Sequence, residues 1–397
     1  MPREDYLIFN FSDGRAYVRK DRISQIRRAD GIIFDCDGVL IDVRRSYNRA
    51  ISKSVTYILE GMTGYSVPES LISDEIIHLF RRTGGFNNDW DTVYGILMFI
   101  LSSLPKEIRR CLEGFMEKNE DEDSPFKRLM LIKEYAKRES KMRMLNKEFF
   151  AESIEKLKNF TDLLDFTGKE SVDKSLLKIY GSDENFRRFY LLLKRFLHPA
   201  EDVGKSIIST VFEEIFCGPI LFKEIYGANP QFNKEPGLID NERLIVQSET
   251  LDSLISILGK RNLGIASGSR RKSAEYMLGE LIEKFNPKAL VFAETVEIAE
   301  RSMKKSLKKP HPFSLLKAAE GFGEFNFLIY VGDSVEDALM ASEAAKLKGR
   351  ILFAGVYRYK SFEEGTLRIF LDYGCDMILP TVNELPLIMK ELRRKED

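Results

Sequence analysis

The sequence is poor in histidine and cysteine, and each scarcity argues against a common kind of site. Only three histidines occur in 397 residues, far apart in the chain, which argues against a histidine-rich metal site and against a Ser-His-Asp triad. The four cysteines are scattered and form no C-x-x-C pair. This pattern is typical of reduced thiols in a cytosolic protein. Any chemistry is therefore expected to depend on carboxylates and lysines.

Neither an excess of charge nor a long apolar run is present. The 61 basic and 62 acidic residues give a formal net charge of −1, whereas nucleic-acid binders usually carry a basic excess. The longest apolar run, at residues 94–104, is too short to span a bilayer, and charges lie where the apolar core of a signal peptide would be. We expect a cytoplasmic protein without nucleic-acid or membrane partners, and the sequence leaves its oligomeric state open.

Short apolar runs mark the strands of an α/β fold. Residues 6–18 predict a β-hairpin that turns at Asp13-Gly14. The run at residues 31–35, GIIFD, has no alternation and is typical of a strand buried on both faces of a parallel sheet. Further short runs alternate with helical patterns at residues 263–266, 289–294, 327–333, 350–356 and 376–381. The alternation predicts a doubly wound, parallel sheet covered by helices.

A long helical segment interrupts this α/β pattern. Helical periodicity dominates residues 43–240, and the stretch 182–199 is a clear example, with its apolar residues on one face and Ser182 or Asp183 available to cap its start. We therefore predict an α/β core formed by residues 1–42 and 241–397. A mostly α-helical domain, residues 43–240, is inserted after the first strand of that core.

Acidic and small polar residues follow three of the predicted strands. Asp35 and Asp37 end the first one, Ser267-Gly268 follows the strand at 263–266, and Asp333 follows the strand at 327–333. In an open parallel sheet, ligands bind beyond the carboxyl ends of the strands. Buried carboxylates at one edge repel each other and require a cation, and Mg²⁺ prefers such hard oxygen ligands together with phosphate. The pattern predicts a site for phosphoryl transfer.

Four motifs in this order resemble those of the haloacid dehalogenase-like (HAD) superfamily. They are the D-x-D-G motif in 31–42, hydrophobic residues ending in serine at 263–267, a lysine with nearby prolines before a helix at 308–318, and G-D-x-x-x-D before an alanine-rich helix at 328–344. The resemblance covers about 31–42 and 245–385. The position of the insert is that of a C1-type cap in this superfamily, although this insert is larger than usual.

The resemblance implies a role for each residue of the D-x-D-G and lysine motifs. Asp35 is expected to be the nucleophile, and Asp37 the general acid and base. Lys309, which directly precedes the sequence PHP, is expected to pair with the phosphate and with Asp35. The neighbouring Lys304, Lys305 and Lys308 are the alternatives for this position.

The same resemblance implies the phosphate-binding and metal-binding groups. Ser267 and Gly268 are expected to hold the transferring phosphoryl group. Asp333 is expected to bind Mg²⁺ directly or through water, with support from Asp337. Asp35 and the backbone carbonyl of Asp37 complete the expected metal site.

These roles describe a Mg²⁺-dependent phosphatase that acts on a small phosphorylated metabolite through an aspartyl phosphate. A dehalogenase of the same fold is disfavoured, because it needs no acid two residues after its nucleophile. A phosphomutase or phosphotransferase would share every motif and stays open. A non-catalytic, partner-binding protein is a third alternative, and the intact motifs argue against it.

One stretch of the insert, residues 81–95, is a candidate for substrate selection. It holds the only tryptophan of the chain, two adjacent glycines and the sequence Asn-Asn-Asp at 87–89. Asn88 can bond substrate hydroxyls, or it can cap the helix that follows. The resemblance to HAD-like proteins also implies that Arg44 and Arg45, where the chain leaves the core, lie near the same substrate site. We therefore predict Asn88 and Arg45 as substrate-binding residues, with helix capping as the alternative for Asn88.

Overall fold

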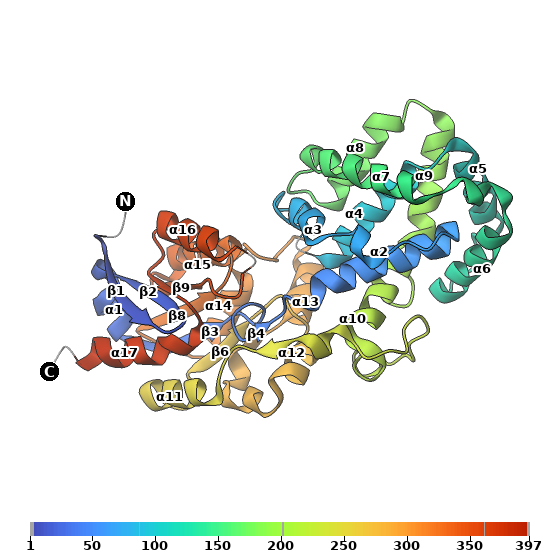
Figure 1. Cartoon of the computed structure of the whole chain (residues 1–397). Helices are drawn as coiled ribbons and strands as arrows, with labels where there is room; N and C mark the ends of the chain where they lie inside the picture. Colours follow the sequence, from blue (N-terminus) through green and yellow to red (C-terminus); the bar gives the residue numbers. More distant parts are fainter. Residues whose placement is uncertain (1–3, 87, 201, 361, 395–397) are drawn as a thin grey trace. The chain divides into compact units, whose positions relative to one another are not determined.

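The chain folds into two compact units in the computed structural model, which describes residues 4–86, 88–200, 202–360 and 362–394. One unit consists of Met1–Arg44 and Asn241–Asp397, and the other of Arg45–Asp240. Figure 1 draws the first in blue and in yellow to red, and most of the second in light blue to green. The first unit is an α/β structure and the second is helical.

The α/β unit contains a mixed, mostly parallel sheet, as predicted. Within the described residues the strand order is β1-β2-β10-β9-β8-β3-β6-β7. Six of these strands run parallel to one another, namely β3 (Ala29–Phe34), β6 (Leu263–Ala266), β7 (Leu290–Val291), β8 (Phe327–Gly332), β9 (Ile351–Val356) and β10 (Met377–Leu379). Strand β3 lies between β8 and β6, so its carboxyl end lies between theirs.

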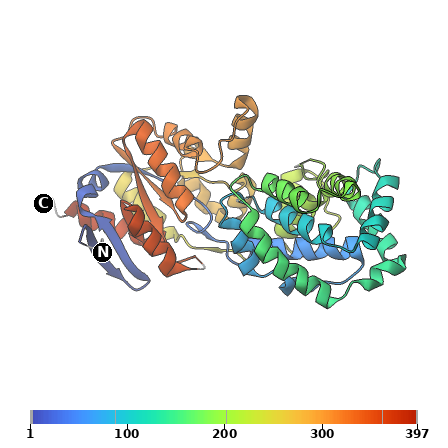
Figure 2. The same cartoon turned by 90° about the horizontal axis from the view of Figure 1, so that it is seen from above.

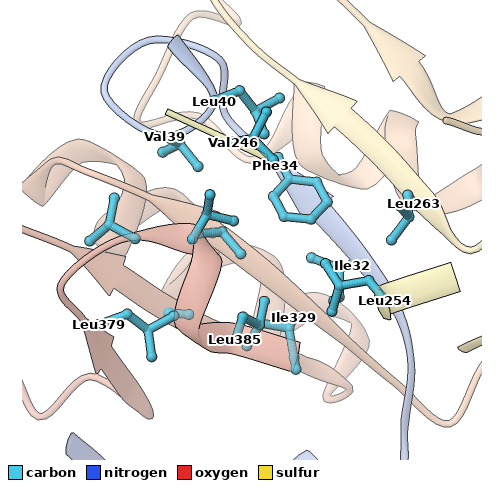
Figure 3. Packing of buried hydrophobic residues seen from close by; sticks show 14 of the residues in the cluster. Ile32, Phe34, Val39, Leu40, Val246, Leu254, Leu263, Ile329, Leu379 and Leu385 are labelled. Atoms are coloured by element: carbon cyan, nitrogen blue, oxygen red, sulfur yellow. The ribbon is translucent and has the colours of Figure 1, made fainter. Parts of the chain in front are cut away.

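The side chains of β3 alternate between two hydrophobic cores, one on each face of the sheet. Ile32 and Phe34 pack in the core shown in Figure 3, with Leu254 and Leu385 among their partners. Ile33 belongs to the opposite core. Burial on both faces explains why this strand reads as a continuous apolar run.

Helices cover both faces of this sheet. The core around Ile32 and Phe34 includes residues of α1 (Ile23–Arg27), α11 (Ser248–Leu258), α12 (Arg271–Leu278) and α17 (Leu385–Arg394). The opposite core includes residues of α14 (Phe313–Glu320), α15 (Val335–Lys348) and α16 (Glu363–Tyr373). The sheet is therefore doubly wound, as the sequence predicted.

The predicted N-terminal hairpin forms and joins the main sheet. Strands β1 (Tyr6–Phe11) and β2 (Gly14–Arg19) pair antiparallel, and β2 also pairs antiparallel with β10. A second antiparallel pair, β4 (Ile41–Asp42) with β5 (Arg243–Leu244), joins the chain segments on either side of the insert.

One predicted strand is wrong in length. The apolar run at 289–294 was expected to be a strand, but β7 ends at Val291 and α13 (Ala293–Met303) begins two residues later. The backbone N–H of Ala293 donates to the carbonyl of Ser269. The chain therefore leaves the sheet after Val291, and the second half of the apolar run belongs to a helix.

The second unit is built from helices, and its described residues include no strand. Figure 2 shows these helices packed around one another. They are α2 (Tyr47–Thr63), α3 (Asp74–Arg81), α4 (Asp89–Ser102), α5 (Lys106–Lys118), α6 (Pro125–Arg138), α7 (Lys147–Phe160), α8 (Lys169–Tyr180), α9 (Glu184–Leu197) and α10 (Ile207–Tyr226).

Two helices of this unit match specific predictions. The apolar run at 94–104 lies largely in α4, whose residues from Thr92 to Ser102 are buried. The amphipathic stretch at 182–199 forms α9, and the side chain of Asp183 caps it by accepting from the backbone N–H of Asn185. Across the described part of the chain, every helix is too short or too polar to cross a membrane.

Candidate active site

Asp35 and Asp37 lie on a tight loop that follows β3. The backbone N–H of Asp35 donates to the carbonyl of Val331 in β8, so the strand pairing continues to this residue. Beyond it the carbonyl of Cys36 accepts from the backbone N–H groups of Leu40 and Ile41, which closes the loop. Asp35 is only 7% exposed. A carboxylate thus lies buried at the carboxyl end of β3.

Gly38 permits this loop to approach the end of β8. Its φ of +74° lies in the left-handed region, which a residue with a Cβ rarely adopts. A Cβ at this position would lie 2.0 Å from Oδ2 of Asp333. The D-x-D-G motif therefore requires glycine at this position for a steric reason, because only a residue without a Cβ lets the loop after β3 approach the loop after β8.

Lys309 lies between two buried carboxylates. Its Nζ is 2.6 Å from Oδ2 of Asp35 and 2.7 Å from Oδ1 of Asp337. Burial acts to lower the pKa of Lys309, but Asp337 and Asp35 outweigh it and raise this pKa well above its usual value. The three alternative lysines of the same stretch are exposed. The structure thus brings Lys309, and none of those three, to Asp35.

Asp337 is the anchor of this lysine. It stands in the first turn of α15 and forms a capping box with Ser334. Its Oδ2 accepts from the backbone N–H groups of Asp333 and Ser334 and from the Ser334 hydroxyl, and its Oδ1 accepts from Lys309 and from the Tyr330 hydroxyl. Burial opposes ionisation, but Lys309 and these bonds lower the pKa of Asp337. It is a charged group that holds other groups in place.

Three carboxylates could hold a metal ion here. Asp35, Asp333 and Asp337 each offer an oxygen, and these oxygens all lie within 4.8 Å of one another. Carboxylate oxygens are hard donors of the kind that Mg²⁺ prefers. Because Asp337 already accepts five hydrogen bonds from described residues, Asp35 and Asp333 are the better placed ligands. Asp333 also contacts a cation of the protein, since its Oδ2 lies 2.6 Å from Nζ of Lys360.

A chain of hydroxyl groups connects the loop after β6 to Asp37. Ser267 is 1% exposed, and its hydroxyl donates to the hydroxyl of Ser269 at 3.1 Å. The Ser269 hydroxyl donates to Oδ2 of Asp37 at 2.9 Å. Gly268 lies between the two serines, and among the described residues other than Gly268 itself, Ser267 and Ser269, no atom lies within 4 Å of the place that its Cβ would take.

The environment raises the pKa of both aspartates of the D-x-D-G motif. Burial, followed by the charge of Asp35, raises the pKa of Asp37 to about 7. Burial also raises the pKa of Asp35 to about 6, against the opposing effect of Lys309. At neutral pH the geometry therefore provides one carboxylate that is mostly ionised next to one that can carry a proton.

Sequence reasoning assigned no role to Ser269 or to Lys360. Ser269 could have been noticed as the second hydroxyl of the sequence Ser-Gly-Ser, two residues after Ser267. Lys360 follows β9 and belongs to none of the four motifs. Only the strand order, in which β9 lies beside β8, brings Lys360 to Asp333.

The two residues predicted from the insert belong to the helical unit. Arg45 is exposed in the turn before α2. Asn88 is the N-cap of α4, and its Oδ1 accepts from the backbone N–H of Trp90 at 3.0 Å. The Trp90 indole donates to Oε1 of Glu213 at 2.9 Å. Helix capping, the alternative considered for Asn88, is thus present, and residue 87 of the same sequence lies outside the described residues.

Comparisons with known proteins bear on this arrangement. The chain resembles the X-ray structure of a structural genomics target, ZR25, with a TM-score of 0.65 and 18% identity over 92% of this chain and 99% of that one. A second structure, phosphatase Tt82 from Thermococcus thioreducens, has a TM-score of 0.48 and 20% identity over 86% of this chain and 98% of that one.

The first of these structures shows a shared fold. A comparison with curated proteins gives no match. The family model described as haloacid dehalogenase-like hydrolase matches residues 29–345, which include the insert and all four motifs. The chain therefore belongs to the haloacid dehalogenase-like hydrolases.

Proposed function

We propose that the chain is a Mg²⁺-dependent phosphatase that hydrolyses a monoester of a small phosphorylated metabolite. The observation that supports this most is the position of Asp35. Its buried carboxylate lies 2.6 Å from Lys309, next to Asp37 and Asp333. An ionised carboxylate in this position can attack a phosphorus atom. The fixed cation beside it can neutralise the negative charge of the transferring phosphoryl group.

In the first step an oxygen of Asp35 attacks phosphorus. The bond between phosphorus and the ester oxygen breaks, and Asp37 gives its proton to the departing oxygen. A pKa of about 7 means that a large share of Asp37 carries a proton at neutral pH. The products of this step are the free alcohol, a phosphorylated Asp35 and an ionised Asp37.

In the second step water attacks the phosphorus of the aspartyl phosphate. Asp37 accepts a proton from this water, and the bond between phosphorus and the Asp35 oxygen breaks. Inorganic phosphate leaves, Asp35 is again a carboxylate and Asp37 is again protonated. Ser269, which donates to Asp37, keeps this carboxyl group in place during both proton transfers.

The equatorial phosphate oxygens need positive charge and donors. Lys309 supplies a charge, and the Ser267 hydroxyl can turn from Ser269 to a phosphate oxygen, with Gly268 leaving space beside it. Asp35, Asp333 and the backbone carbonyl of Asp37 would hold Mg²⁺, with Asp337 as their support. When bound, this ion neutralises negative charge on the transferring group.

Selectivity is proposed to involve the helical unit. Its Arg45 offers an exposed guanidinium to an anionic or hydroxylated substrate, and Asn88 offers an amide at the start of α4. A phosphatase core shared by many enzymes needs such additional contacts to distinguish its substrates.

The proposal is tested with p-nitrophenyl phosphate. The wild-type protein should release p-nitrophenol, lose this activity with EDTA and regain it with Mg²⁺, with Ca²⁺ a poor substitute because it favours looser, higher coordination. Asp35→Asn should be inactive with an unchanged circular dichroism spectrum, whereas Asp372→Asn, at an exposed position on α16, should keep full activity. Substantial turnover by pure Asp35→Asn would remove the nucleophile assignment.

A second assay identifies the substrate class and the fate of the phosphoryl group. A panel of phosphorylated metabolites is screened for release of inorganic phosphate. The best substrate is then incubated with candidate acceptor alcohols, and the products are separated by chromatography. If inorganic phosphate is released and no acceptor alcohol becomes phosphorylated, the result supports a phosphatase. Transfer of the phosphoryl group to an acceptor in preference to water would make the protein a phosphomutase or phosphotransferase.

A further inference from the structure

The segment that follows β9 brings a second lysine to the acidic cluster. Nζ of Lys360 lies 2.6 Å from Oδ2 of Asp333, and the side chain of Lys360 is 33% exposed, against 13% for Asp333. Since β9 lies next to β8 in the sheet, this segment leaves the sheet at the same edge as Asp333. Lys360 has no part in the proposed mechanism described above.

The two lysines of this cluster occupy different positions. Lys309 lies between Asp35 and Asp337, and its side chain is 16% exposed. Lys360 contacts Asp333, and its side chain is about twice as exposed as that of Lys309. The ammonium group of Lys360 places a positive charge beside a carboxylate, Asp333, that would also bind the metal ion. Two cations that contact the same carboxylate lie close enough to repel each other. Binding of the metal ion to Asp333 is therefore less favourable while Lys360 is in contact with it.

The backbone on the N-terminal side of Lys360 is held by its neighbours. The Tyr359 ring lies 4.9 Å from the guanidinium of Arg44, which itself bonds both carboxylate oxygens of Asp42. Arg358 pairs with Glu363 at 2.8 Å. A lysine has a flexible four-carbon stem. Its ammonium group can therefore move by several ångströms while the segment that carries it stays in place.

We propose that Lys360 competes with the divalent cation for Asp333 and that it moves to the phosphoryl group of the substrate when the cation binds. This inference rests on the proposed function, because it assumes a metal and a phosphorylated substrate at this edge of the sheet. Without the metal, the ammonium group of Lys360 neutralises part of the charge of the acidic cluster. With the metal, the same group becomes a ligand for phosphate, so metal and phosphate bind cooperatively.

The test measures metal binding directly, without substrate turnover. Mg²⁺ is titrated into the full-length wild-type protein and into Lys360→Met in a calorimeter, with and without inorganic phosphate. Lys360→Met should bind Mg²⁺ about tenfold more tightly than wild type without phosphate. The factor by which phosphate strengthens Mg²⁺ binding should be smaller in the variant than in wild type. Lys346→Met is the matched control, because it removes a surface lysine that pairs with Glu343, and its Mg²⁺ affinity should equal that of wild type.

Two further variants distinguish loss of the Lys360 charge from a change in the fold. Lys360→Gln should strengthen Mg²⁺ binding as Lys360→Met does, and Lys360→Arg, which keeps the charge, should stay within a factor of three of wild type. Unchanged or weaker Mg²⁺ binding by the Met and Gln variants would overturn the competition. A wild-type protein that binds no Mg²⁺ at all would instead overturn the proposed function, so the two failures are distinguishable.

Discussion

Nζ of Lys309 lies 2.7 Å from Oδ1 of Asp337, and through this contact Asp337 indirectly positions the candidate nucleophile, Asp35. Asp337 is fixed at the start of α15 by the hydroxyl and the backbone N–H of Ser334. Lys309, held by Asp337, in turn contacts Asp35. The end of one strand and the first turn of a distant helix are thereby connected through one ammonium group.

Replacing Lys309 by methionine should abolish most activity and destabilise the fold. The loss of a fixed charge at the transferring group should lower kcat about 100- to 1,000-fold. Removing one partner of a buried ion pair costs of order 3–5 kcal/mol, because Asp35 and Asp337 lose their counter-charge. Protonation of these carboxylates relieves part of that loss at low pH, so thermal melts should show a larger destabilisation at pH 8 than at pH 5. Lys308→Met, at the exposed neighbouring position, should change neither property.

Replacing Gly38 by alanine should separate steric from conformational effects. Both Gly38 and Gly323 have positive φ, at 74° and 70°, so alanine costs about 1–2 kcal/mol of backbone strain at either. Only at Gly38 does the added Cβ meet a carboxylate, Oδ2 of Asp333. Gly38→Ala should therefore lose both Mg²⁺ binding and stability, whereas Gly323→Ala should lose stability alone. Calorimetric titration with Mg²⁺ and thermal melts of both variants test this, and equal Mg²⁺ affinity would contradict the steric role of Gly38.

The acid role of Asp37 predicts a pH dependence that differs between substrates. The pKa of Asp37 is raised to about 7, so the proton needed by the leaving group is present below this pH and is lost above it. With an alkyl phosphate, kcat/KM should fall roughly tenfold for each pH unit above about 7. With p-nitrophenyl phosphate the leaving group needs no proton, and the decline should be much weaker. Profiles from pH 5 to 9 with both esters decide the matter, and identical declines would argue against Asp37 as the acid.

The same raised pKa predicts that Asp37 lowers stability at neutral and alkaline pH. Its pKa rises from 3.8 to about 7 on folding, so the folded protein binds the proton more tightly than the unfolded chain does. The contribution to stability is full below about pH 4 and is lost as the pH rises through 7. Asp37→Asn should therefore raise the melting temperature at pH 8 by a larger amount than at pH 4, where the carboxyl group is neutral in the folded protein and only partly ionised in the unfolded chain. An equal rise in melting temperature at both pH values would show that the surroundings do not disfavour the ionised form of Asp37.

Asn88 should affect stability through the start of α4. Its Oδ1 accepts from the backbone N–H of Trp90, so Asn88→Ala should cost about 0.5–2 kcal/mol. Asn146, which caps α7 by accepting from Phe149, provides a matched control, and Asn146→Ala should cost a similar amount. If Asn88 also contacts substrate, Asn88→Ala alone should lower kcat/KM for the best metabolite by about 1–3 kcal/mol in the transition state, with hydrolysis of p-nitrophenyl phosphate little changed. Equal kinetics of the two variants would leave Asn88 as a helix cap.

Much of the core was predictable because its signals are local. The strand before Asp35 is apolar on both faces, and such a run is recognised in sequence without knowledge of its neighbours. The place of Lys309 directly before Pro-His-Pro favours it over three nearby lysines, and the structure brings it to Asp35. The apolar run at 289–294 was read as one strand because hydrophobicity alone does not show where a chain turns from strand to helix.

Ser269 and Lys360 depend on relationships that sequence does not display. The hydrogen bond from Ser269 to Asp37 requires the loops after β6 and β3 to meet at one register. The contact of Lys360 with Asp333 requires the adjacency of β9 and β8, and a lysine on a surface segment is otherwise unremarkable. In the helical unit, amphipathic patterns predicted individual helices, but they contain no information about which faces bind a ligand.

Strand β3 is far in sequence from both of the strands that it pairs with, and this separation affects how the protein is made. β3 ends at Phe34, whereas its neighbours β6 and β8 begin at Leu263 and Phe327. At about 5–20 residues per second, a ribosome needs roughly 15–60 s between finishing β3 and supplying β8. During that time the contiguous helical unit can already form. Before β6 and β8 are made, β3, which is buried on both faces of the finished sheet, has no partner strand, so we expect its exposure to chaperones or to aggregation to depend on the speed of synthesis.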